Sequence, residues 1–107
     1  MVILKWSRIE ELAQGETVEG AVIIGRFKEQ IKETKRPQGV TFSIQSPNGE
    51  LEVSAVYEAE IKPLDLEKIR RVSDSNTEMR AVGTYTHKTG EKYCGELKVK
   101  ELEYVLH

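Results

Sequence analysis

The chain has 107 residues, of which 38% are apolar and 32% charged, and 16 basic against 18 acidic residues give a formal net charge of −2. This length fits one domain with a small core, and the apolar fraction is too high for a disordered tail. The acidic balance excludes a protein that coats nucleic acid through bulk positive charge, but it is compatible with a locally basic groove.

Membrane segments and cysteine chemistry find no support in the sequence. The longest apolar runs, residues 1–4 and 21–24, have four residues each, whereas a helix across a bilayer needs about 20. The single cysteine, Cys94, excludes an internal disulfide and a Cys-based zinc site. We therefore expect no membrane contact and a place in the reducing cytoplasm.

The first expected element is a short helix at about residues 8–14. Ser7 and Glu10 have the spacing of a capping box, with Ser7 as the N-cap, and Gly15 predicts a left-handed stop. Trp6 precedes this helix, and we expect it to cover an end of the domain rather than to bind a ligand.

A strand is expected next, over residues 17–29, because β-branched residues are enriched there. Simple alternation puts Val18, Val22 and Ile24 on one face. Gly20 lies between them and indicates a strong bend or close packing.

Two hairpins follow, at residues 40–58 and 79–104. The first has strict alternation on both sides of Pro47-Asn48-Gly49, a strong turn signal. The second turns at residues 87–91. Its last apolar residues, from Leu102 on, continue at a shifted phase, as a β-bulge would produce.

A helix is expected between the hairpins, with Asp65 as its N-cap and apolar residues at threefold spacing over residues 66–72. The order is then helix, strand, hairpin, helix, hairpin. Five strands with a helix between the third and fourth favour an all-β OB-fold barrel at about residues 16–104, within a single domain spanning 1–107. The alternatives are an SH3-like barrel or an open α+β sheet.

Five segments follow one another in the order of the expected strands: Val18-Glu19-Gly20-Ala21-Val22, Gly39-Val40-Thr41-Phe42-Ser43-Ile44, Asn48-Gly49-Glu50-Leu51-Glu52-Val53, Met79-Arg80-Ala81-Val82-Gly83-Thr84-Tyr85 and Gly95-Glu96-Leu97-Lys98-Val99-Lys100-Glu101-Leu102. These segments resemble the five strands of OB domains of the anticodon-binding and replication-protein-A type. The resemblance implies binding of single-stranded DNA or RNA on the face of the second and third strands, bordered by two loops.

Net positive charge is concentrated in the two segments that this fold would place beside the binding face. Residues 26–36 and residues 80–100 each contain five basic and two acidic residues. A basic funnel of this kind tracks a phosphate backbone, whereas the alternative is ordinary solvated surface charge. The candidate phosphate-binding residues are Arg26, Lys28, Lys35, Arg36, Arg80, Lys88 and Lys92.

Candidate base contacts are fewer. Phe27 has the opposite parity to Val22 and Ile24 and is the best stacking candidate, with packing under a loop as the alternative. Tyr85 and Tyr93 lie near strand ends, where a ring can emerge from the barrel. Thr41 and Ser43 are expected on the outer face as hydrogen-bonding groups.

Catalysis finds little support. His87 is expected in a solvated turn without an acidic neighbour, and Cys94 on the outer face of the last strand without a partner base. We expect no enzyme, metal or cofactor. The expected function is a module that binds single-stranded DNA or RNA, within a larger protein or beside other subunits. The alternative is a protein-interaction OB module with no role in nucleic-acid binding.

Overall fold

The computed structural model describes residues 2–33, 40–57, 67 and 78–104. Its elements are β1 (Val2–Ile3), α1 (Trp6–Glu11), β2 (Thr17–Glu33), β3 (Val40–Gln45), β4 (Glu52–Tyr57), β5 (Glu78–His87) and β6 (Gly95–Tyr104). No helix within these residues is long and apolar enough to cross a membrane.

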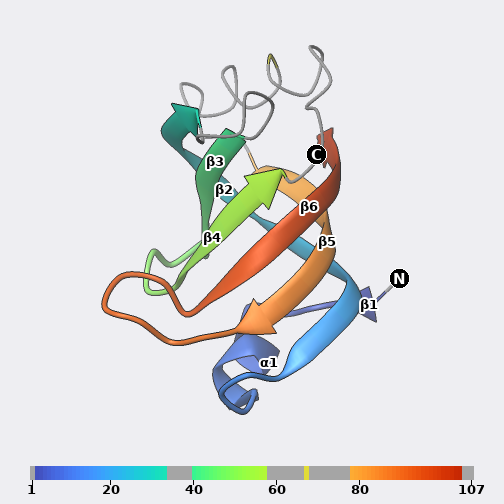
Figure 1. Cartoon of the computed structure of the whole chain (residues 1–107), viewed down its shortest axis with the longest axis vertical. Coiled ribbons are helices and arrows are strands. Elements are labelled where there is room, and N and C mark those ends of the chain that lie inside the picture. Colours follow the sequence, from blue (N-terminus) through green and yellow to red (C-terminus); the bar gives the residue numbers. More distant parts are fainter. Residues whose placement is uncertain (1, 34–39, 58–66, 68–77, 105–107) are drawn as a thin grey trace.

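Strands β2 to β6 close into a five-stranded barrel of the OB-like type (Figure 1). The order around the barrel is β2-β3-β4-β6-β5, and β2 pairs again with β5 to complete the closure. All these pairs are antiparallel except β4 with β6. This confirms the expected five-stranded barrel, and the short β1 adds to the free edge of β2 in parallel.

The long strand β2 serves both halves of the barrel. Residues 17–26 pair with β5 and residues 26–33 pair with β3, so that Arg26 has a partner on each side, Glu78 and Gln45. A strand can change partners in this way only if it bends. Gly20 provides part of the bend: it has a positive φ of 63° and lies in a bulge between Val18 and Ala21.

This bulge corrects the expected faces of β2. It adds one residue to β2 opposite β5 and therefore reverses the alternation. Val18 packs against the core, together with Ala21, Ile23 and Phe27. The prediction that Val18 shares a face with Val22 and Ile24 is therefore wrong.

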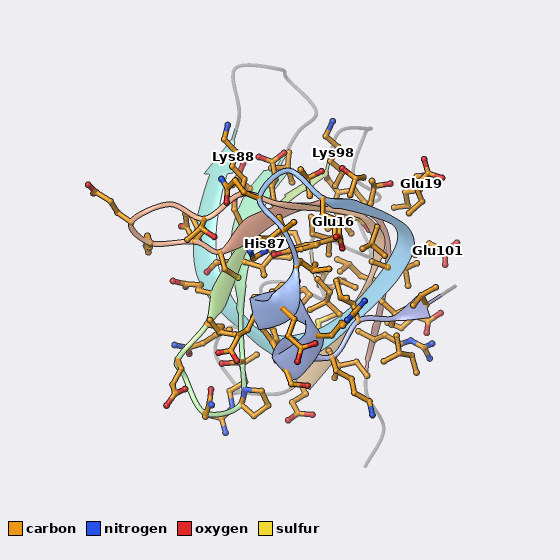
Figure 2. All side chains as sticks on the ribbon, turned by 90° about the horizontal axis from the view of Figure 1, so that it is seen from below. Glu16, Glu19, His87, Lys88, Lys98 and Glu101 are labelled. Atoms are coloured by element: carbon orange, nitrogen blue, oxygen red, sulfur yellow. The ribbon has the colours of Figure 1, made fainter. Side chains whose placement is uncertain are left out.

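The core fills the barrel with aliphatic and aromatic side chains from every strand of the closed barrel and from α1. Phe27 and Phe42 pack ring against ring, with centroids 4.8 Å apart and an interplanar angle of 31°. Helix α1 lies across one end of the barrel (Figure 2). Trp6 Nε1 donates a hydrogen bond of 2.7 Å to the carbonyl of Ile24, and this agrees with its expected covering role.

The helix starts earlier than expected. It spans Trp6–Glu11 with Lys5 as its N-cap and without a side-chain cap, so the predicted capping box at Ser7 is wrong. The indole bond of Trp6 to β2 fixes the start of the helix, and Ser7 becomes an exposed helical residue. Gly15 has the expected positive φ, 86°. It turns the chain into β2, and its N–H donates to the carbonyl of His87 at 2.7 Å.

Both predicted hairpins are present. Gly49 has a positive φ of 78° in the turn between β3 and β4, and Asn48 Oδ1 accepts the N–H of Glu50 at 3.1 Å. In the second hairpin the register shifts between Val82 and Gly83, which leaves Lys100 of β6 in a bulge. This is the bulge that the phase shift before Leu102 predicts. The helix expected at residues 65–72 lies outside the described residues, apart from Glu67, which has helical backbone.

The bulge brings the backbone of β6 close to Gly83, and this contact gives a first prediction. A Cβ at residue 83 would overlap the carbonyl of Lys98. We expect Gly83→Ala to lower the free energy of unfolding by about 1–3 kcal/mol, measured by urea denaturation. The matched control is Gly90→Ala, where the nearest atom would be 3.7 Å away. Equal stability of the two variants would contradict the close approach.

Candidate nucleic-acid-binding face

The outer face of the β3–β4 hairpin is polar. Ser43 pairs with Ser54 across the hairpin, and Thr41 pairs with Val56. The Ser43 hydroxyl is buried and donates a 2.9 Å hydrogen bond to the carboxylate of Glu52 on the same face. The face thus offers hydroxyl and carboxylate groups instead of the aromatic rings of a stacking platform.

This face is flanked by charged residues on both neighbouring strands. On the β2 side, Lys28 pairs with Ser43 and Arg26 pairs with Gln45. On the β6 side, Glu96 pairs with Ser54. Backbone pairing therefore gives one continuous row from Lys28 through Ser43 and Ser54 to Glu96.

The loop between β5 and β6 folds against the outer surface of β4 and borders an open hollow of about 270 Å³. Its lining includes Ser54 from β4, Glu96 from β6, and Lys88, Glu91, Lys92 and Tyr93 from the loop. Lys92 Nζ lies 5.3 Å from the centroid of the Tyr93 ring. The hollow combines an aromatic ring with two positive and two negative charges.

Backbone hydrogen bonds hold this loop in place. Lys88 N–H donates to the carbonyl of Cys94 at 3.2 Å, and Cys94 N–H donates to the carbonyl of Glu52 at 3.0 Å. A third bond, 3.1 Å from the N–H of Thr89 to Gln14 Oε1, ties the loop to the turn after α1. The loop is thus attached to both β4 and the N-terminal segment.

A buried polar cluster lies under the loop. The Tyr85 hydroxyl is 3.0 Å from His87 Nδ1 and donates to the carbonyl of Cys94 at 3.3 Å. His87 Nε2 is 3.3 Å from the hydroxyl of Thr89. Gly95 leaves room for this arrangement, because a Cβ there would overlap the Tyr85 hydroxyl. Thr89 also lines the hollow, so the cluster connects the core to the hollow.

The cluster corrects two expectations. His87 ends β5 and is 7% exposed, so it is not a solvated turn residue (Figure 2). Cys94 packs against the core, and its Sγ donates to the carbonyl of Glu52 at 3.4 Å. Burial raises the pKa of the Cys94 thiol. A protonated, hydrogen-bonded thiol is a poor nucleophile.

The structure brings together only part of the predicted site. Lys88, Lys92 and Tyr93 line the hollow, and Thr41 lies on the adjoining face. Ser43 is on the same face, but it is 0% exposed and its hydroxyl already donates to Glu52, so the prediction that it contacts a ligand is wrong. Phe27 and Tyr85 are wrong as stacking residues, because they are 3% and 0% exposed. A barrel this small needs its aromatic rings to fill the core.

The remaining predicted residues are distributed differently. Arg26 is half-buried on the β2 flank of the face, and Lys28 is on the same strand. Arg80 is on β5, which pairs with β2 and β6 and not with β3 or β4, so it lies away from the face. Lys35 and Arg36 lie outside the described residues.

Six lining residues were missed as site residues: Ser54, Thr89, Gly90, Glu91, Gly95 and Glu96. The alternation of residues 51–57 already placed Ser54 on the outer face. The resemblance implies that this loop borders the face, but the arrangement of Glu91 and Glu96 with Ser54 around one hollow depends on hydrogen bonds of the loop to Glu52 and Gln14, which have no signal in the sequence. Among the described residues, no group of three or more His, Cys, Asp or Glu side chains is placed to hold a metal ion.

Comparison with known proteins adds no assignment. No protein-family model matches the chain, and no curated protein matches it in sequence. The arguments about function therefore rest on the barrel, its outer face and the hollow.

The buried Tyr85 hydroxyl gives a prediction about pH. Burial, and then the neighbouring Cys94, raise the pKa of Tyr85 well above its ordinary value of 10.0. Above pH 10 the unfolded chain releases this proton and the folded chain keeps it, so stability falls as the pH rises. We expect Tyr85→Phe to lose about 1 kcal/mol at pH 7 and to show less of the alkaline decline.

The measurement is urea unfolding from pH 7 to pH 11, with Tyr93→Phe as the control because its ring is half-exposed. An alkaline decline of the same size in Tyr85→Phe and in the unchanged chain would contradict the role of the buried hydroxyl.

Proposed function

We propose that the chain binds single-stranded DNA or RNA across the outer face of β3 and β4, with one nucleotide entering the hollow. The observation that carries the proposal is the position of Tyr93 and two lysines against the outer surface of β4. In OB barrels the binding face is bordered by the third barrel strand, here β4, and by the loop that joins the last two strands, here β5 and β6. The strand order and the resemblance of the five segments support the same assignment.

The proposed binding combines three kinds of contact: charge, stacking and hydrogen bonding. Lys88 and Lys92 attract phosphates, the Tyr93 ring stacks on a base, and hydroxyl groups such as that of Ser54 contact bases or sugars. The net charge of −2 and the single half-exposed ring in the hollow predict modest affinity. Such a module works best within a larger protein or beside other subunits, in a reducing compartment such as the cytoplasm.

We propose binding rather than catalysis because the possible nucleophile and base are otherwise engaged. Cys94 and His87 are both held in the hydrogen-bonded cluster under the loop. Neither of these two residues lines the hollow.

The charge contribution is tested with fluorescence anisotropy, using U12 and dT12 at two salt concentrations. We expect saturable binding at low salt that weakens at high salt. Lys88→Ala/Lys92→Ala should weaken binding and reduce the slope of log affinity against log salt by roughly one to two units. The control Lys5→Ala/Arg8→Ala removes the same charge outside the hollow and should bind as the unchanged chain does. A salt slope unaffected by the lysine variant would contradict the site.

The stacking contribution is tested separately. We expect Tyr93→Ala to lose about 1–3 kcal/mol of binding free energy, because the base loses its aromatic partner. Tyr93→Phe keeps the ring and should retain most of the affinity. Equal affinities of the two variants in the same anisotropy assay would show that the ring does not stack.

Protein interaction is the second candidate function, and one observation favours it. Val2 and Ile3 of the edge strand β1 are 55% and 60% exposed. An exposed apolar edge strand is a template for an extended segment of another chain. Absence of saturable oligonucleotide binding at low salt would contradict nucleic-acid binding and favour this candidate.

A further inference from the structure

The charged side chains that line the hollow restrict the kind of chemical group that it can bind. A site for phosphate alone would gather cations, yet this lining includes Glu91 and Glu96 together with Lys88 and Lys92. A carboxylate repels phosphate and only accepts hydrogen bonds, whereas a lysine only donates them. The hollow therefore suits a group that presents donors and acceptors next to each other.

Glu96 is the carboxylate best placed for recognition. It lies on β6 beside Ser54 of β4 in the parallel pair. Both residues lie on the outer face, because the next residue along each strand, Ala55 or Leu97, is buried in the core. Within the described ranges the Glu96 carboxylate has neither a hydrogen bond nor an ion pair. Glu91, by contrast, lies on the loop. A strand holds its side chains more firmly than a loop does.

From these positions we infer that the hollow takes a guanine base, an inference that rests on the proposed function. Guanine alone among the four bases carries two adjacent donors, N1–H and N2–H2, that meet both oxygens of one carboxylate. Its O6 and N7 accept hydrogen bonds from a lysine. In this arrangement Glu96 accepts from N1–H and N2–H2, Lys88 or Lys92 donates to O6, and Tyr93 stacks on the ring.

The size of the hollow agrees with a single base. The hollow has a volume of about 270 Å³ and is open to solvent, so one planar base has room to enter it. Neighbouring nucleotides would then lie on the open face of β3 and β4.

The test compares U9 with four RNAs that differ from it only at the central position, which holds G, inosine, A or C. Inosine keeps N1–H and O6 but lacks the N2 amino group. We expect the central G to bind roughly tenfold more tightly than U9. Inosine should lose most of this gain, and A and C should gain little.

The matched variants are Glu96→Gln and Glu101→Gln, which change the charge equally and replace exposed side chains of the same strand with isosteric ones. We expect Glu96→Gln to reduce the preference for G, measured as the ratio of its affinity to that of U9, to less than threefold. Glu101 does not line the hollow, so Glu101→Gln should keep the preference. Circular dichroism confirms that both variants fold.

Each outcome decides between the two claims. Binding of U9 without preference for G over inosine, A and C would overturn the guanine assignment and leave the proposed function standing. A preference for G that survives in Glu96→Gln, or that is lost in Glu101→Gln, would overturn the role of Glu96. Failure of all five RNAs to bind at low salt would overturn the proposed function and this inference together.

Discussion

The double pairing of β2 is the constraint on which the rest of the structure depends. One strand closes the barrel by pairing with β5 along its first half and with β3 along its second, and Arg26 pairs with both. Closure places the β3–β4 hairpin beside β6, and it requires the close approach at Gly83 and the bulge at Gly20. The hollow follows from this geometry, because β6 lies beside β4 and the β5–β6 loop bonds to Glu52 of β4 before it enters β6.

The β5–β6 loop contributes both to the stability of the fold and to the candidate site. The cluster of Tyr85, His87 and Cys94 belongs to the core on one side and contacts Thr89 of the hollow on the other. The two residue types most often associated with catalysis, His and Cys, thus help to hold the loop. The groups left facing outward, a tyrosine, two lysines and two glutamates, are suited to recognition by stacking and hydrogen bonding.

Local signals in the sequence predicted the elements well. Alternation and turn residues predicted both hairpins, and the phase shift before Leu102 predicted the bulge at Lys100. Alternation failed at Gly20, because the middle of β2 is apolar on both faces and the bulge leaves no trace in the pattern. Phe27 was misassigned for a related reason: with the outer side of β2 taken as core, its own inward position was read as outward. The capping box predicted at Ser7 does not form, because the helix already begins at Trp6, whose indole bonds to Ile24 of β2.

The site was predictable only in part, because it depends on contacts between distant residues. Lys88, Lys92 and Tyr93 were predicted as site residues, but their position beside Ser54 and Glu96 depends on hydrogen bonds from the loop to Glu52 and Gln14. The central claim is that this hollow is where single-stranded nucleic acid binds, and an NMR titration of backbone amides with U9 tests it most directly. The account predicts that the largest shift changes fall on Ser54 and residues 88–96. Changes confined to β1 and α1 would contradict it, as would the absence of any change at saturating U9.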